Sequence, residues 1–505
     1  MRKVSVVVPV YNPGRYLDDL LASLARQSMP ADEFEVVFVD DGSADGSQHR
    51  LDDLEASSAN VRVIHIPNSG WPGRPRNVGI EEAEGEYVQF VDHDDELADE
   101  ALQRMYEYAV ANCSDVVIGR EGRRRKVWGA GPLFATDRPN ATLQDDPALL
   151  LLLTPHKMFR RAFLLEQGIR FLEGPRYLED HAFVMTAYFR AEVISVLAGY
   201  TCYFWHRRRG SAGRRPKDWG RYFDSMRDVL DVVEEHTTPG ELRDRLLSHW
   251  YRTKGLRRLG PKFIDLPEAE ARAFFQGLRA LTLERFPARL DAQRQLGSLR
   301  LRAALLRAGA YEKTRELAAV ERAMYVTEHV DDLKVSPNRL ELTLTATLRH
   351  GDGSALRLDR ADGVFVLPPP VSLAGIDVPT SALGVVLRQE RMTLTVYARH
   401  PSTDQRFALP GRTTIVGVRT DGRLQVSVTA HVWVDPTVVE EGGPMRAGQW
   451  WLEAELGFAG WVARSPIRSR RISARFGDAD VRLSGSRPVI RSWVLGRAVR
   501  AGKDR

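Results

Sequence analysis

The feature that most constrains the fold of this chain is a short apolar segment that ends abruptly in acidic residues. Tyr87–Val91 has the character of a buried strand, and Asp92, Asp94 and Asp95 follow it directly. Alternation along an extended segment sends Asp92 and Asp94 to the same side. Two carboxylates this close repel each other, so they favour a cation between them, and a hard divalent metal would suit the pair. A solvated acidic turn at a strand end is the competing interpretation.

Other apolar segments of the amino-terminal part also end in polar groups. Val4–Val8 and Phe34–Val39 are predicted strands, separated by the helical periodicity of Arg15–Gln27. Strands that alternate with helices indicate an α/β domain with a mostly parallel sheet covered on both faces. Ligands of such sheets bind beyond the carboxyl ends of the strands. Because Asp41 and Asn68 lie at such ends together with the aspartates, the sequence predicts one site there.

The pattern changes twice further along the chain. Helical periodicity extends from residue 218 to about residue 320, and short alternating strands follow, which indicate β-sandwiches. Arg339–Ala346 resembles Arg423–Ala430, and this weak repeat favours two tandem immunoglobulin-like sandwiches. The predicted domains are an α/β domain (1–217), a helical linker domain (218–320) and two β-sandwich domains (321–410 and 411–500).

Composition narrows the classes of protein that fit. A chain of 505 residues, 43% hydrophobic and 28% charged, is a folded protein of several domains. The net charge of +5 is too modest for a nucleic-acid-binding protein, but the basic runs Arg120–Lys126 and Arg207–Arg215 would suit an anionic polymer or membrane surface. Two cysteines and no long apolar segment lead us to expect a cytoplasmic protein, peripheral at the inner face of the membrane.

Six short motifs give the amino-terminal part a family resemblance. Across about the first 210 residues, the chain resembles the family 2 glycosyltransferases of the Rossmann-like GT-A fold, with the motifs in that family's order and spacing. The matching stretches are Val8–Asn12, Val39–Ser43, Asn68–Gly70, Arg76–Gly79, Asp92–Asp95 and Leu178–Asp180. The resemblance implies an inverting, metal-dependent transferase that uses a nucleotide-sugar, most simply a UDP-sugar.

The nucleotide-sugar that would donate the sugar needs particular contacts, and these suggest roles for residues of the first motifs. Pro9 and Tyr11 would form an apolar wall for the base, and Asp41 would accept the N–H of a uracil. Asn68 and Arg76 would reach toward the nucleotide. For Asp41 the competing role is a turn carboxylate; for Asn68 and Arg76, taken singly, a loop stabiliser and a surface cation are preferred.

The resemblance also implies the chemistry of the acidic motifs. Asp92 would face the ribose, and Asp94 would coordinate Mn²⁺ or Mg²⁺. His93, between them, is grouped with the nucleotide-binding residues, although simple space filling is favoured for it. Asp180 would be the general base and Glu179 would orient the acceptor or Asp180, while acidic residues complementing a helix dipole are the alternative.

The segment that ends the α/β domain is aromatic and then basic. The resemblance implies that it closes over the diphosphate, with His206 as a second metal ligand or phosphate donor. Arg207 and Arg209 would meet the diphosphate or an anionic acceptor, and a solvated surface position is equally compatible with each.

The order of the predicted domains carries a second resemblance. A GT-A domain, a helical linker and β-sandwiches together resemble the bacterial enzymes that glycosylate wall teichoic acid. This resemblance implies a glycan or anionic-polymer acceptor and a homo-oligomer, a trimer, held by the carboxyl-terminal β-domains. No nucleic-acid partner is expected.

Two alternatives to the transferase remain open. A nucleotidyltransferase would want a glycine-rich, lysine-bearing phosphate loop after the first strand, which Pro9–Arg15 does not provide. A catalytically inactive carbohydrate-binding scaffold would be expected to have lost Asp94 or Asp180, and both are present.

Overall fold

The computed structural model describes residues 2–122, 132–206, 218–293, 297–336, 339–361, 364–366, 368–379, 382–385, 392–399, 406–420, 423–434, 448–467, 472–476, 479–484 and 487–492. The chain divides into two compact units, Met1–Leu247 and Ser248–Arg505. Among the described residues, no helix has both the length and the apolar character that crossing a bilayer requires.

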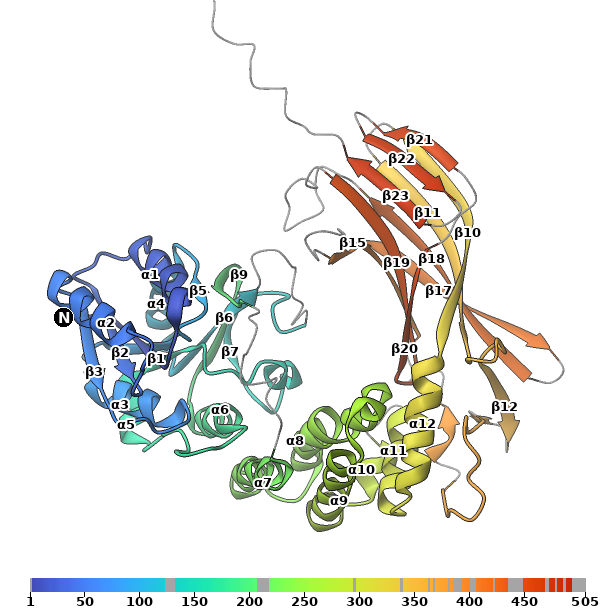
Figure 1. Ribbon diagram of the computed structural model, residues 1–505, viewed down its shortest axis with the longest axis horizontal. Helices are drawn as coiled ribbons and strands as arrows, with labels where there is room; N and C mark the ends of the chain where they lie inside the picture. The colour runs from blue at the N-terminus through green and yellow to red at the C-terminus, as the bar shows by residue number, and fades with distance from the viewer. Residues whose placement is uncertain are drawn as a thin grey trace, which may run out of the picture. The chain divides into compact units, whose positions relative to one another are not determined.

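The first unit is built on a nine-stranded sheet (Figure 1). Its strands are β1 (Val4–Val10), β2 (Phe34–Asp40), β3 (Val61–His65), β4 (Tyr87–Phe90), β5 (Glu96–Leu97), β6 (Val116–Gly122), β7 (Arg138–Ala141), β8 (Met158–Arg160) and β9 (Ile194–Phe204). The order is β3-β2-β1-β4-β8-β6-β9-β5, with β7 beside β9. Strands β1 to β4 run parallel, whereas β8 is antiparallel to both β4 and β6. The predicted α/β fold is confirmed.

Helices cover both faces of this sheet (Figure 1). They are α1 (Leu17–Ala25), α2 (Ser47–Ser57), α3 (Gly73–Glu82), α4 (Ala101–Asn112), α5 (Arg161–Glu166) and α6 (Glu179–Arg190). The apolar sides of α1, α2 and α4 share one core cluster with alternate residues of β1 and β2. On the other face, α3 lies so close to β1 that a Cβ added at Gly79 would meet Val7 Cγ1 at 2.2 Å. The strands therefore have two buried faces, which explains their continuous apolar runs.

Helices also form the region that follows the sheet. In the first unit, α7 (Trp219–Glu235) packs against α6; α8 (Glu241–Trp250) follows and contains Leu247, where the first unit ends. The second unit contains α9 (Glu268–Arg285), α10 (Arg289–Gln293), α11 (Gly297–Arg307) and α12 (Tyr311–Ala323). The predicted helical region is therefore present, and its limits at residues 218 and 320 stay a prediction.

The second unit also contains two antiparallel sheets, as predicted. The first is made of β10 (Tyr325–Ser336), β11 (Arg339–Arg349), β12 (Arg357–Ala361), β13 (Val364–Val366), β14 (Gly384–Val385), β17 (Gly411–Thr420) and β18 (Arg423–Val434). The second is made of β15 (Thr393–Arg399), β16 (Arg406–Ala408), β19 (Gly448–Phe458), β20 (Trp461–Pro466), β21 (Ile472–Phe476), β22 (Ala479–Ser484) and β23 (Arg487–Ser492). Apolar residues of both sheets share one core cluster.

The strand pairing gives a different explanation for the apparent repeat. Its two segments belong to β11 and β18, which pair directly with each other in the first sheet. They bury the same face, with Leu342 and Leu344 on one strand and Val428 and Ala430 on the other, so their sequence patterns coincide. In the second sheet, β15 likewise pairs with β19 across residue 410. Among the described residues, the predicted boundary between 321–410 and 411–500 therefore does not separate two sandwiches.

A buried polar cluster fastens α11 and α12 to the second sheet. Arg302 on α11 donates to Glu321 Oε2 on α12 at 2.6 Å, and the indole N–H of Trp461 donates to Glu321 Oε1 at 3.0 Å. Glu321 and Trp461 are buried. Burial raises the pKa of Glu321, while the charge of Arg302 opposes that rise. The buried carboxylate of Glu321 therefore depends on hydrogen bonds both from a helix, through Arg302, and from the second sheet, through Trp461.

One histidine of the first unit makes folding stability depend on pH. The ring nitrogens of His65 lie 3.0 Å from an oxygen of Asp40 and 2.9 Å from one of Asp52. These hydrogen bonds, Asp40 first, raise the pKa of His65. The pKa of His65 in the folded protein lies above its unfolded value of about 6.5. The His65 ion pairs therefore contribute fully to folding stability below that value, and this contribution is lost as pH rises through the folded pKa.

Replacing His65 by Gln is therefore expected to destabilise the protein at acid pH more than at alkaline pH. Since the side chain is 40% exposed, we expect a difference of only a few tenths of a kcal/mol. Urea unfolding of wild type and His65→Gln at about pH 5.5 and about pH 8.5 measures it. An equal difference in unfolding free energy at both pH values would contradict the assigned pairs.

Candidate active site

The loops after β1 and β2 are tied together at the carboxyl ends of their strands. The backbone N–H of Asn12 donates to Ser43 Oγ at 2.9 Å, and the Asn12 side-chain oxygen accepts the N–H of Ala44 at 2.8 Å. Asn12 has a φ of 46°, in the left-handed region that asparagine tolerates better than most residues. These two hydrogen bonds hold the loops after β1 and β2 in a fixed arrangement at this edge of the sheet.

The loop after β3 is held by Asp41. The carboxylate of Asp41 accepts the Ser69 backbone N–H at 2.7 Å and the Ser69 hydroxyl at 3.0 Å, while its carbonyl accepts the Asn68 amide at 2.9 Å. Gly42 has a φ of 71°, and a Cβ there would lie 3.0 Å from the Asn68 backbone nitrogen. Asp41 and Asn68 thus take the turn and loop roles that were the alternatives. Their contacts with a uracil nucleotide stay a prediction.

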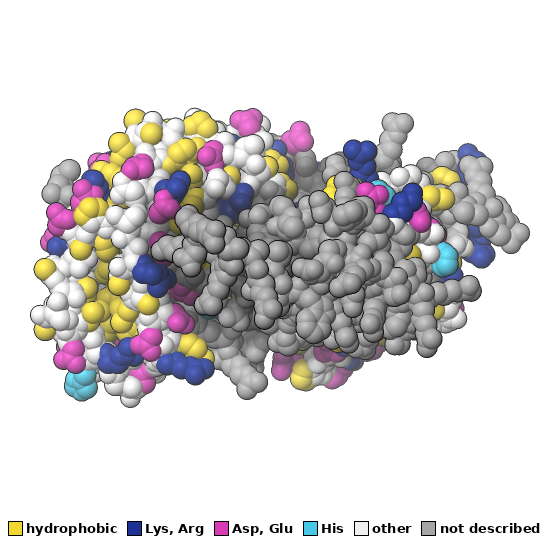
Figure 2. Space-filling view, turned by 90° about the horizontal axis from the view of Figure 1, so that it is seen from above, with side chains coloured by type: hydrophobic (Ala, Val, Ile, Leu, Met, Phe, Trp, Pro, Cys, Tyr) yellow, Lys and Arg dark blue, Asp and Glu magenta, His cyan; other side chains and the backbone are white. Residues whose placement is uncertain are grey.

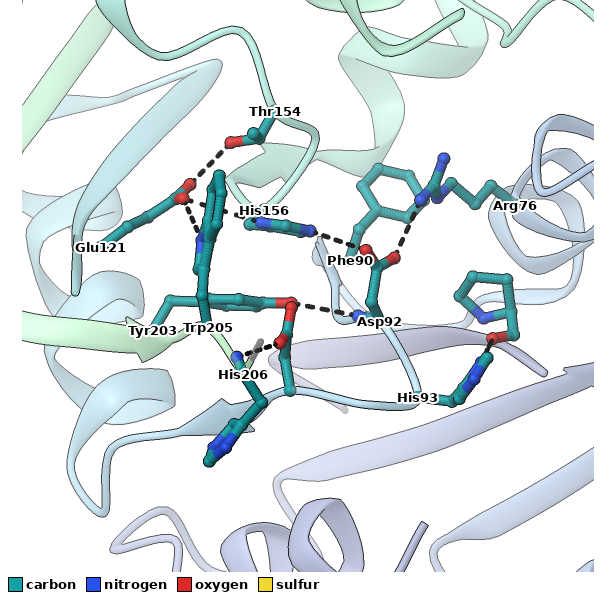
Figure 3. A network of polar contacts seen from close by, with 12 residues as sticks. Arg76, Phe90, Asp92, His93, Glu121, Thr154, His156, Tyr203, Trp205 and His206 are labelled. Atoms are coloured by element: carbon teal, nitrogen blue, oxygen red, sulfur yellow. Dashed lines mark hydrogen bonds and ion pairs between the residues drawn. The ribbon is translucent and has the colours of Figure 1, made fainter. Parts of the chain in front are cut away.

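Pro9 and Tyr11 lie at the end of β1, and His93, in the loop after β4, contacts Pro9. Tyr11 is 46% exposed, so its ring is accessible as a wall for a base, whereas Pro9 is buried. The Pro9 carbonyl lies 3.1 Å from His93 Nδ1, which must carry the proton because a carbonyl oxygen only accepts (Figure 3). His93 therefore does more than fill space, because it fastens the aspartate loop to β1.

Asp92 is held from three directions (Figure 3). Its Oδ1 accepts from Arg76 at 2.8 Å, and its Oδ2 lies 3.2 Å from His156 Nε2. Its backbone N–H donates to the Tyr203 hydroxyl at 3.2 Å. Burial alone would raise the pKa of Asp92, but the charges of Arg76 and His156 outweigh it and hold the pKa far below its usual range. Asp92 is therefore an ionised carboxylate with a fixed orientation.

Asp95 ties the same loop to the end of β9. Its side chain accepts the Tyr203 hydroxyl at 2.8 Å and the backbone N–H of His206 at 2.7 Å. Burial raises the pKa of Asp95 to about 7, and the charges of Asp92 and Asp94 contribute to the rise. Both oxygens of the Asp95 side chain are therefore engaged by groups at the end of β9.

His156 and Glu121 complete the buried network, and the sequence motifs did not reveal them. His156 Nδ1 lies 3.7 Å from Glu121, an ion-pair distance beyond hydrogen-bond reach, and Glu121 accepts the Trp205 indole N–H at 2.5 Å and the Thr154 hydroxyl at 2.7 Å. The His156 ring stacks on that of Tyr203, with centroids 4.1 Å apart. Burial opposes protonation of His156, but the charge of Asp92 raises its pKa to about 10.

A buried lysine stands next to His156 in the chain. Lys157 is fully buried, and its ammonium group donates to the Thr154 carbonyl at 2.5 Å. Burial lowers the pKa of Lys157 to about 8, while the charges of Glu121 and Asp180 oppose that shift. The only sequence signal for either residue is a His-Lys pair at the start of an apolar strand, which no local pattern distinguishes from a surface turn.

The predicted catalytic acids begin α6. Glu179 accepts from Arg76 at 3.2 Å and from the Trp71 indole N–H at 3.3 Å. Burial raises the pKa of Glu179 to about 7, and the neighbouring charge of Asp180 adds to the rise. Asp180 is half-buried, and its Oδ1 accepts the backbone N–H of His181 at 2.9 Å.

Arg76 joins the two acidic groups. The side chain is 5% exposed, and its guanidinium bonds to Asp92 at one end and Glu179 at the other, over the ring of Phe171 at 5.2 Å. The surface role that was preferred for Arg76 alone is therefore wrong. A contact with the nucleotide stays a prediction, since both observed bonds are to carboxylates.

The basic segment after β9 is described only at its start. The His206 ring lies 2.6 Å from Glu96 Oε1 and is directed away from the Asp92–His156 pair (Figure 3). A metal-ligand role for His206 stays a prediction. Arg207 and Arg209 lie outside the described residues, as does most of the run 120–126.

Among the described residues, ligand atoms of Asp92, Asp95 and His156 lie close enough together to hold a metal ion, within 4.8 Å of one another. These side chains already bond to Arg76, Tyr203 and each other, so a metal there would have to displace those partners. Asp94 is half-buried in the same loop. Carboxylate oxygens are the hard donors that Mg²⁺ and Mn²⁺ prefer, so the residue type is compatible with a metal at Asp94.

The chain matches two sequence families over separate ranges. Residues 5–166 match Glycosyl transferase family 2, and residues 220–318 match the Glycosyl transferase TarS linker domain. The first range contains the sheet from β1 to β8 and the Asp92 loop. The second contains α7 to α11.

Two similar proteins are named for the same polymer, poly(ribitol-phosphate). The chain is 36% identical over 239 residues to poly(ribitol-phosphate) beta-glucosyltransferase of Bacillus spizizenii, covering 46% of this chain and 37% of that one. It is 37% identical over 258 residues to poly(ribitol-phosphate) beta-N-acetylglucosaminyltransferase TarS of Staphylococcus aureus, covering 50% and 44%. The chain thus spans less than half the length of these two relatives.

A solved structure extends the likeness to three dimensions. The crystal structure of S. aureus TarS 1-349 in complex with UDP-GlcNAc superposes with a TM-score of 0.57 at 26% identity, covering 74% of this chain and 98% of that one. The superposition agrees with the GT-A sheet, the covering helices and the linker described above. By these matches, the amino-terminal part of the chain is similar to glycosyl transferase family 2, and the region that follows is similar to the linker domain of TarS.

Proposed function

We propose that this chain is an inverting, metal-dependent glycosyltransferase. It moves a hexosyl or N-acetylhexosaminyl group from a UDP-sugar to a hydroxyl of a teichoic-acid-like polymer or a related cell-envelope glycan. The relatives named for poly(ribitol-phosphate) and the related structure that holds UDP-GlcNAc support this choice of substrates.

One observation carries the proposal. Arg76 bonds both to Asp92, in the loop where a donor would bind, and to Glu179, at the start of the helix that carries Asp180. A donor-side carboxylate and the proposed base are therefore fixed relative to each other by one buried guanidinium. Such fixed geometry is what a single displacement between two bound substrates requires.

The reaction follows from the roles of these groups. Asp180 would take the proton of the acceptor hydroxyl as that oxygen attacks the anomeric carbon, and the bond to the UDP oxygen breaks on the opposite face. The attack from one face and departure from the other invert the anomeric configuration. A Mn²⁺ or Mg²⁺ ion held by Asp94 would supply charge neutralisation for the diphosphate leaving group.

Glu179 is better suited to orienting than to proton transfer. Both of its oxygens accept hydrogen bonds, from Arg76 and from Trp71. Because those partners fix its position, Glu179 would hold the α6 terminus and Asp180 in place. The half-buried Asp180 is left as the base.

The acceptor and the location of the enzyme belong to the same proposal. On the face shown in Figure 2, Lys/Arg and Asp/Glu side chains are interspersed over the described surface without forming a field of one sign. The basic runs around residues 120–126 and 207–215 would supply cations for an anionic polymer. We propose a cytoplasmic enzyme, peripheral at the inner membrane face, that forms a homo-oligomer through its carboxyl-terminal sheets.

The test is a donor and acceptor screen on the full chain. We expect one UDP-sugar to be hydrolysed slowly in the presence of Mn²⁺ and to be transferred when poly(ribitol phosphate) is added. The anomeric proton coupling of the product, measured by NMR, should show inversion. An intact fold that binds no UDP-sugar at millimolar concentration would contradict the proposal, and polymer binding without UDP-sugar binding would favour the inactive-scaffold alternative.

A further inference from the structure

His156 occupies an unusual position for a histidine outside the sequence motifs. Its side chain is 6% exposed, with Nε2 directed at Asp92 and Nδ1 at Glu121 (Figure 3). The ring lies flat on that of Tyr203, at an interplanar angle of 7°. These neighbours come from three separate parts of the first unit, the ends of β4, β6 and β9, while His156 itself stands just before β8. The ring has no room to turn without losing contacts on each side.

This position determines how Asp92 is oriented. Arg76 reaches only Oδ1 of Asp92, and a single partner leaves the carboxylate free to rotate about its Cβ–Cγ bond. His156 reaches the other oxygen, so two donors on opposite oxygens fix the plane of the group. Charge-assisted hydrogen bonds of this kind are among the stronger ones in proteins.

Glu121, the residue that Nδ1 of His156 faces, is itself held in place by hydrogen bonds. Glu121 is 1% exposed, and its two oxygens accept from Thr154 and Trp205. Trp205 also places its ring edge toward His156, at a centroid distance of 5.9 Å. The His156 ring thus lies between two carboxylates, with Asp92 in hydrogen-bond contact with Nε2 and Glu121 at ion-pair distance from Nδ1.

We propose that His156 is a positioning residue for the donor: it sets the orientation of the Asp92 carboxylate, through which Asp92 meets the sugar nucleotide. The inference rests on the proposed function and deepens it by adding a residue outside the recognised motifs. Misplacement of a binding group by about 1 Å is enough to weaken a site substantially. Donor affinity should therefore depend on His156, although His156 need not touch the donor.

Three variants separate positioning from core packing. His156→Phe keeps a flat ring on Tyr203 but removes both nitrogens, and it should weaken UDP binding about tenfold or more. The amide of His156→Gln falls near the position of Nε2 and should keep most of the affinity. The amide of His156→Asn falls near Nδ1 instead and should behave like the Phe variant. If the Phe variant does not fold, the UDP affinities of the Gln and Asn variants still test the positioning role. Both side chains are polar amides, but only that of Gln is long enough to reach Asp92.

The measurements are UDP affinity by calorimetry and the donor KM and kcat. A positioning role raises the donor KM and the UDP Kd, whereas a purely structural role lowers the active fraction, and with it apparent kcat, at unchanged donor KM. In an Asp92→Ala background, His156→Phe should cause no further loss of UDP affinity. His65→Phe is the matched control, since His65 also lies between two carboxylates of the first unit, Asp40 and Asp52; it should keep UDP affinity within about twofold.

The outcomes distinguish the two proposals. The role of His156 alone would be overturned if wild type and His156→Phe bound UDP equally well. It would also be overturned if His156→Phe lowered UDP affinity as much in the Asp92→Ala background as in the wild type. Failure of the wild-type chain to bind UDP or any UDP-sugar would overturn the proposed function and this inference with it.

Discussion

Replacing Asp180 by Asn is expected to lower kcat for sugar transfer by about 10²- to 10⁴-fold, the range typical of a lost general base. Affinity for the UDP-sugar should be unchanged, because the proposed role of Asp180 concerns the acceptor proton only. Asn keeps an oxygen for the backbone N–H of His181, so the start of α6 should stay intact. Donor binding by calorimetry and transfer to poly(ribitol phosphate) measure the two effects separately.

The control addresses the alternative that Asp180 only complements the helix dipole. Asp19 is an exposed acidic residue in the first turn of α1, outside the proposed site. Asp19→Asn removes a first-turn charge in the same way and should leave kcat unchanged. If Asp180→Asn lowers the melting temperature like Asp19→Asn but keeps full activity, the base must be another residue.

Replacing Asp94 by Ala is expected to abolish transfer, and EDTA should do the same to the wild-type enzyme. A metal contributes several kcal/mol to charge stabilisation on a leaving group, so we expect a loss of at least about 100-fold. Added Mn²⁺ should restore the EDTA-treated wild type but not the variant. Mn²⁺ binding in the presence of UDP, measured by electron paramagnetic resonance, reports on the metal independently of activity.

Two further variants test where the metal lies. Asp99→Ala removes an exposed carboxylate further along the same segment and should keep both Mn²⁺ binding and activity. If Asp95→Asn abolishes Mn²⁺ binding while Asp94→Ala does not, the metal belongs to the Asp92, Asp95 and His156 group instead. The choice of Asp94 as ligand would then be wrong.

The sequence predicted those parts of the fold that short segments determine. Apolar runs such as Val4–Val10 are followed by polar groups, and the rule that ligands meet the carboxyl ends of parallel strands was enough to bring Asp41 and Asp92 to one edge. The structure adds that Asp41 and Asn68 are bonded to each other's loops, which a motif does not reveal.

The rest depended on contacts between distant segments. His156 and Glu121 meet because β8 lies between β4 and β6 in the sheet, an order that no local pattern encodes. The similarity between residues 339–346 and 423–430 was correct as a pattern but was misinterpreted as a repeat. Two strands that pair in one sheet and bury the same face acquire similar alternation without duplication.

The cluster of Arg302, Glu321 and Trp461 has a consequence for how related chains can diverge. Removing one partner of a buried ion pair typically costs about 3–5 kcal/mol, because the other charge stays buried without compensation. Exchanging the whole cluster for apolar side chains of similar volume is often nearly neutral. Single substitutions should therefore be selected against, whereas joint replacement should be tolerated. In descendants of a common ancestor, these three positions should change together, even though they belong to α11, α12 and β20.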